Sequence, residues 1–115
     1  MFGKNDLSLG RVYDTVTIRE GSDKLVLHVN GDPNRMVAGL EQARKQLLTI
    51  NEETSDEDRR EIALFFAGVI FGEDQAKKLL DFYHEDGSCV VGITGKYFSS
   101  RLSKIITKAQ KKQLK

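Results

Sequence analysis

The apolar residues of this chain change their spacing at Asp32-Pro33. Between residues 11 and 30 they alternate with polar ones on both arms of a turn at Glu20-Gly-Ser-Asp23, which is the pattern of a β-hairpin. Beyond Pro33 they recur every three or four residues, which is the spacing of amphipathic helices. A two-stranded hairpin is marginal in water unless its apolar face is covered. The sequence therefore predicts an α+β fold, mostly helical, in which the hairpin packs on a bundle of about four helices within residues 33–112.

Capping residues indicate where these helices begin. Asp32 followed by proline is typical of a helix start, and so is Ser55 followed by three acidic residues. Ser88 is the expected cap of the last helix. The predicted helices cover about residues 33–50, 55–72, 73–84 and 89–110.

The segment Val90-Val-Gly-Ile-Thr-Gly-Lys-Tyr97 has the glycines and the lysine of a phosphate-binding loop. A P-loop needs glycine at the place of Val90 and serine or threonine at the place of Tyr97, so the pattern disfavours nucleotide binding. The apolar residues keep helical spacing through the segment, which predicts a helix instead. Gly92 and Gly95 each weaken that helix by about 1 kcal/mol relative to alanine. We expect another helix to pack closely on these two glycines.

Size and composition indicate one domain over residues 1–115. The chain has 115 residues, 39% of them hydrophobic, and a formal net charge of +1. Cys89 is its one cysteine, which excludes an internal disulfide and fits a reducing compartment. The first ten residues lack the apolar core of a signal peptide, and no stretch approaches 18 apolar residues. We therefore expect a cytoplasmic protein with no membrane contact.

Residues that could carry catalysis are few and scattered. His28 is expected to point to solvent from its strand, and His84 to end a helix, where the dipole stabilises it. Cys89 lies near a predicted helix N-terminus, where the dipole favours the thiolate, but no histidine is placed beside it. No catalytic, cofactor-binding or metal-binding residue is therefore predicted, and the chain is not expected to be an enzyme.

The C-terminal part of the chain is basic. From Ser88 onward it has no acidic residue and seven basic ones. These residues are Lys96, Arg101, Lys104, Lys108, Lys111, Lys112 and Lys115. Such a face can neutralise phosphates, so a small nucleic-acid-binding accessory protein is one alternative. The same face is also typical of a solvated helix end, and it could dock the acidic segment 51–61 of a second copy in a homo-oligomer.

Aromatic residues gather in the helical part of the sequence. Most of them are expected in the core. Any aromatic side chain that lines an exposed groove would receive an amphipathic helix of a partner. The candidates for this partner-binding role are Phe71, Phe82, Tyr97 and Phe98.

The segments FFAGVIFGEDQAKKLLDFYHEDGSCVV and GKYFSSRLSKIITKAQKK, within residues 60–112, resemble the tail assembly chaperones of long-tailed bacteriophages and related prophages. The hairpin before them is similar more loosely. The resemblance implies a non-enzymatic protein made in the infected bacterial cell. It also implies binding of the long helical tape-measure protein until the tail tube assembles around it, together with self-association.

Overall fold

The computed structural model of the protein describes residues 10–114. Within that range a two-stranded antiparallel hairpin is followed by helices, which confirms the α+β fold. Strands β1 (Val12–Glu20) and β2 (Asp23–Gly31) pair in register from Val12 opposite Gly31 to Glu20 opposite Asp23. Gly21 opens the two-residue turn with a φ of +60°, the conformation that a type II′ turn requires of its first residue.

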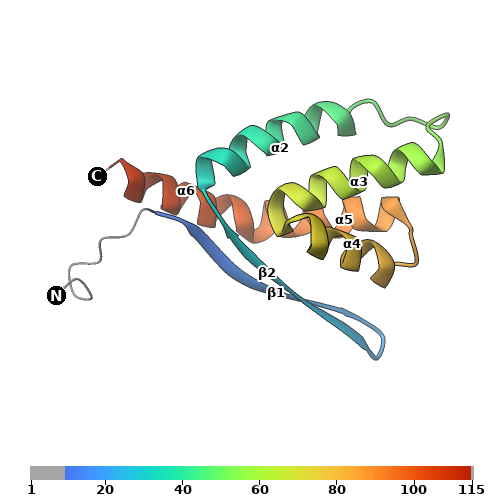
Figure 1. The fold of residues 1–115 in the computed structure, drawn as a ribbon, viewed down its shortest axis with the longest axis horizontal. Helices are drawn as coiled ribbons and strands as arrows, with labels where there is room; N and C mark the ends of the chain where they lie inside the picture. The colour runs from blue at the N-terminus through green and yellow to red at the C-terminus, as the bar shows by residue number, and fades with distance from the viewer. Residues whose placement is uncertain (1–9, 115) are drawn as a thin grey trace.

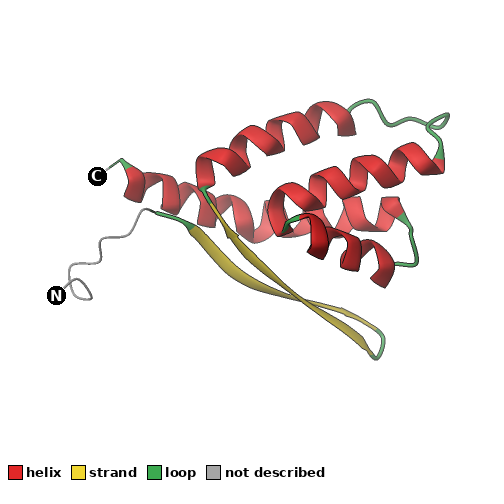
Figure 2. Ribbon diagram, viewed as in Figure 1, coloured by secondary structure: helices red, strands yellow, loops and turns green. Residues whose placement is uncertain are grey.

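Four helical rods follow the hairpin. The first three are α2 (Pro33–Leu47), α3 (Asp56–Phe71) and α4 (Glu73–Phe82). The fourth is continuous and comprises α5 (Gly87–Tyr97), the π-helical segment η1 (Phe98–Leu102) and α6 (Ser103–Gln113). Figure 1 shows the hairpin running along one side of the helices, and Figure 2 shows its turn extending beyond them.

Local capping explains the helix starts. Asp32 accepts a hydrogen bond from the backbone N–H of Arg35 (3.1 Å), and Ser55 accepts one from Asp58 (3.0 Å), as expected. The expectation that Ser88 caps the last helix was wrong. Asp86 takes this role, because its carboxylate accepts the backbone N–H groups of Ser88 and Cys89.

Serine hydroxyls bond back to the preceding turn at the π-helical segment. Ser99 donates to the carbonyl oxygen of Gly95 (3.0 Å), and Ser100 donates to that of Lys96 (2.6 Å). Serine bonds of this kind, to a carbonyl one turn earlier, often accompany a bend in a helix. The helix continues through η1 into α6.

The core lies between the hairpin and the helices. Its strand residues come from the face of the hairpin that carries Val12, Ile18, Leu27 and Val29. Its helical residues come from every helical rod and include Met36, Phe66, Ile70, Phe71, Leu79, Leu80, Val90, Tyr97, Leu102 and Ile106. Burying one such side chain contributes about 1.5–3 kcal/mol, so this shared core holds both layers together.

Polar side chains fasten the hairpin to the helices along its length. Near the turn, Tyr83 donates to Glu20 (2.8 Å). At the centre, the Gln75 side-chain amide accepts from the backbone N–H of His28 (2.8 Å) and donates to its carbonyl (2.6 Å). One amide thus satisfies both backbone groups of a residue at the free edge of β2, as a neighbouring strand would do.

The predicted close packing at Gly92 and Gly95 is wrong. A Cβ atom added at either glycine would meet no atom within 4 Å outside its own helix. Helices approach closely at other glycines. A Cβ on Gly39 of α2 would lie 2.8 Å from Val69 of α3, and one on Gly87 would lie 2.8 Å from the carbonyl oxygen of Arg59.

Candidate functional site

The four aromatic residues predicted to bind a partner lie in different places. Phe71 and Tyr97 are only 5% and 9% exposed, and their rings stack with centroids 5.7 Å apart in the core. Phe82 is half-buried and packs edge-on against Tyr83. Phe98 is also half-buried, and it lines an apolar groove. Of the four candidates, Phe98 therefore stands where a partner could reach a hollow lined by apolar side chains.

This hollow, the α2–α6 groove, has a volume of about 450 Å³. The α2 wall consists of Val37, Leu40, Glu41, Arg44 and Leu47. Phe66 of α3 and Phe98 of η1 contribute aromatic rings, and α6 contributes Ser103, Ile106, Thr107 and Gln110. Two helices therefore flank a largely apolar hollow, and an amphipathic helix docks on surfaces of this kind.

A polar bridge joins the two walls near the start of α2. Asn34 donates to Gln113 (2.6 Å) and accepts from Gln110 (3.2 Å). Gln113 also donates to Asp32 (2.9 Å), and this hydrogen bond lowers the pKa of the Asp32 carboxyl. Figure 1 shows α2 running away from α6 beyond this junction. The bridge therefore fixes the spacing of the two walls at one end.

The exposed apolar residue on the α2 wall is Val37, whose side chain is 43% exposed. Val37 belongs to an apolar stripe of Met36, Val37, Leu40, Ala43, Leu47 and Leu48, whose helical spacing predicts a core-facing side. Val37 lies on the groove because the buried residues Met36 and Ala43 are about 100–120° around α2 from it. Helical spacing identifies the residues that share a face, but it does not reveal how much of that face the rest of the fold covers.

The basic residues do not form one free surface. Arg101 donates from Nε and Nη2 to the two carboxylate oxygens of Asp14, at 2.7 and 2.8 Å. Lys96, Lys104, Lys108, Lys111 and Lys112 are exposed, and Lys115 lies outside the described residues. The predicted basic face therefore loses its arginine to a contact with the hairpin.

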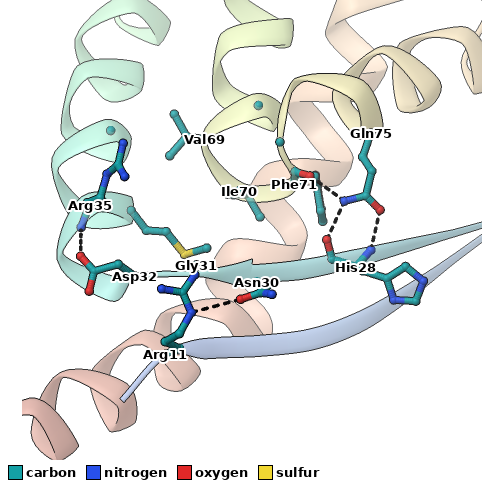
Figure 3. Close-up of a pocket in the computed structure, with 14 residues that line it drawn as sticks. Arg11, His28, Asn30, Gly31, Asp32, Arg35, Val69, Ile70, Phe71 and Gln75 are labelled. Carbon is teal, nitrogen blue, oxygen red and sulfur yellow. Dashed lines mark hydrogen bonds between the residues drawn. The ribbon is translucent and has the colours of Figure 1, made fainter. Parts of the chain in front are cut away.

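A second hollow, of about 560 Å³, lies between β2, α2 and α3 (Figure 3). Most of its polar side chains are engaged within the fold. Arg11 donates to Asn30, Asp32 caps α2, and Gln75 bonds the backbone of His28 and the carbonyl of Phe71. These hydrogen bonds hold structural elements together and account for most of the polar lining. The exposed side chain of Arg35 lines the hollow without taking part in them.

The titratable residues considered for catalysis stay apart. His28 is exposed on the outer side of the hairpin, and His84 has a left-handed φ of 55° at the end of α4. The thiol pKa of Cys89 is raised, chiefly by its hydrogen bond with Asp86, so the lowered pKa expected from the helix dipole is wrong. Among residues 10–114, no three His, Cys, Asp or Glu side chains gather as metal ligands would.

Family models, curated proteins and solved structures give no match to this chain. The site of the proposed function is therefore inferred from the surfaces of the protein itself. Within residues 10–114, none of the helices combines the length and the apolar character needed to cross a bilayer. The α2–α6 groove is the candidate binding site.

Proposed function

We propose that this protein is a non-enzymatic assembly chaperone for the tail of a phage or prophage, and that it binds a helical, tape-measure-type polypeptide in the α2–α6 groove. The observation that carries the proposal is the groove itself. Its lining contains Val37, Leu40, Leu47, Phe66, Phe98 and Ile106. An amphipathic helix can place its residues at i, i+3, i+4 and i+7 against such a surface.

The biological setting rests on the resemblance within residues 60–112. That range includes Phe66, Phe98 and the whole α6 wall of the groove. A tape-measure polypeptide is long and helical, and its apolar stripe would aggregate in the bacterial cytoplasm before the tail tube forms around it. Covering that stripe needs no bond making or breaking, which is why the proposed function is a binding function.

The test is co-purification with proteins encoded beside this one. The tagged protein is co-expressed with its neighbouring genes, captured, and washed at low and then high salt. We expect a long helical polypeptide to remain at high salt, because apolar contacts are not screened by ions. Nucleic acid that leaves at high salt, with no polypeptide retained, would instead support the accessory protein that uses the basic helix.

Val37→Asp provides the matched test of the groove. It places a carboxylate on the wall that the partner would cover, and burying that charge without a cation should reduce the retained polypeptide at least about tenfold. Ala38→Asp is the control, because Ala38 is exposed and lies about 100° around α2 from Val37. Equal retention by both variants, with both folded by circular dichroism, would rule out the groove as the binding site.

A further inference from the structure

The two walls of the α2–α6 groove carry different charge. On α6, Thr107 lines the groove, and Lys104 and Lys111 lie three residues before it and four residues after it. Residues at these spacings are neighbours on a helix surface. Lys108 is also exposed and lies farther around α6 from the groove, about 100° from Thr107. The three lysines form the α6 lysine row, of which Lys104 and Lys111 lie beside the α6 wall of the groove.

These lysines are available to a partner. Lys104, Lys108 and Lys111 are exposed, and within residues 10–114 none forms an ion pair. The charges on the α2 wall are different, because Glu41 and Arg44 pair with each other at 3.4 Å. The exposed Lys45 lies four residues after Glu41 and adds one positive charge beside that wall. The α6 side carries three, so the positive potential is stronger on that side of the groove.

We infer that the α2–α6 groove selects an amphipathic helix whose apolar stripe is flanked by Asp or Glu residues on the side that faces α6. This inference rests on the proposed function and specifies its partner. The apolar lining supplies most of the affinity, while the α6 lysine row fixes which flank of the bound helix turns toward α6. A helix with lysine or arginine on that flank is rejected by like-charge repulsion.

An acidic helix fits these observations better than a nucleic acid does. The lysines lie near a groove whose apolar lining consists of valine, leucine, isoleucine and phenylalanine side chains, and a sugar-phosphate backbone would leave those side chains uncovered. An amphipathic helix satisfies both surfaces together, since its stripe enters the groove while its acidic flank lies against the lysines.

Two synthetic helical peptides of about 20 residues test the inference. They share a leucine and isoleucine stripe and one glutamine flank, and they differ in the other flank, which carries either Glu or Lys. Binding is measured by fluorescence anisotropy at about 0.05 M salt, where exposed charges still interact. We expect the Glu peptide to bind at least about fivefold more tightly, with the difference shrinking as salt rises.

Protein variants assign the preference to the α6 lysine row. The triple variant Lys104→Gln, Lys108→Gln, Lys111→Gln should bind both peptides equally, since it keeps the apolar lining and removes the charge. Changing Lys77 and Lys78 of α4 to Gln is the control and should leave the preference intact. Val37→Asp should weaken the binding of both peptides.

The outcomes separate this inference from the proposed function. If the wild-type protein bound both peptides equally and Val37→Asp bound neither, the acidic preference would be overturned. The groove would remain a helix-binding site. Binding of neither peptide would overturn both. The wild-type protein could instead bind a single-stranded oligonucleotide more tightly than the Glu peptide. If the Gln triple variant lost that oligonucleotide binding, the lysines would be assigned to nucleic acid and the inference would be overturned.

Discussion

Asp14 joins the hairpin to the last helix through three hydrogen bonds. Its carboxylate accepts the Tyr97 hydroxyl (2.7 Å) and two guanidinium N–H groups of Arg101, and its side chain is only 7% exposed. The hydrogen bond from Arg101 is the main reason that the pKa of Asp14 falls to about 2. Burial, followed by the hydrogen bond to Asp14, raises the pKa of Tyr97. The ionised carboxylate is therefore the form that the fold stabilises.

Replacing Asp14 by asparagine should lower the free energy of unfolding at neutral pH by about 2 kcal/mol, the equivalent of the pKa shift. Because the folded pKa lies below the ordinary value of 3.8, the stabilisation is complete above pH 3.8 and is lost as the pH falls toward 2. Urea denaturation of both proteins at several pH values measures this. Wild type and Asp14→Asn should converge in stability at the acid end.

Asp23→Asn is the control for Asp14→Asn, because Asp23 is an exposed carboxylate on the same hairpin. Its effect should stay within about 0.5 kcal/mol. A stability difference between Asp14→Asn and wild type that remains unchanged down to pH 2 would show that the side-chain shape at this position matters and its charge does not.

The candidate site could be predicted from the sequence only in part. Phe98 and the apolar residues of the α2 wall were recognisable as helix-face residues, but periodicity within one helix does not show which faces the other helices cover. In α3 the apolar stripe at helical spacing is Ile62, Phe65, Phe66, Val69 and Ile70. Phe71 lies off this stripe and is still buried, because Tyr97 of α5 stacks on it. Phe65 belongs to the stripe and is nevertheless 39% exposed.

At the scale of elements, the hairpin and the four helical rods followed from local signals, but the π-helical segment η1 and the Asp86 cap did not. These local signals are the change in the spacing of apolar residues, the glycine in the turn, and the caps at Asp32 and Ser55. Each involves residues that are close in the sequence, so each can be recognised from the sequence alone. The contact of Gly39 with Val69 depends on which helix packs against α2. Such contacts join residues far apart in the sequence, and one sequence alone does not specify them.

The glycines of α5 provide a prediction about this element. Gly92 and Gly95 are helical, and a Cβ atom at either would meet open space. Replacing each by alanine should raise the free energy of unfolding by about 0.5–1 kcal/mol, because alanine has less freedom to lose on folding and a better helix propensity. Thermal unfolding should show the melting temperature of the double variant rising by several degrees.

Gly39→Ala is the matched comparison on α2. Its Cβ atom would lie 2.8 Å from Val69, too close for two carbon atoms, so this variant should unfold at a lower temperature than wild type despite its better helix propensity. If Gly92→Ala and Gly95→Ala also lowered the melting temperature, an unseen contact at these glycines would have to exist.

For the whole molecule, the two layers share one core although the molecule is elongated, with extents of 55 × 34 × 22 Å. The inner face of the hairpin packs on the helices, and Asp14, His28 and Glu20 fasten it along its length. A small domain with one continuous core unfolds in a single step. The α2–α6 groove belongs to the same body, since Phe66 contributes both to the core and to the groove lining.

Leu27→Ala tests this cooperativity. Leu27 is fully buried on the inner face of β2, so its truncation should lower the free energy of unfolding by about 2–5 kcal/mol. In urea, far-UV circular dichroism follows mainly the helices. Tyrosine fluorescence reports Tyr13, Tyr83 and Tyr97 together: Tyr13 lies on the hairpin, and the other two bond it through Glu20 and Asp14. Both signals should shift together to a lower midpoint, whereas Val26→Ala, on the exposed side of the strand, should shift them little.

A helical signal that kept the wild-type midpoint would mean that the helices fold without the hairpin. The walls of the groove would then not depend on the N-terminal layer.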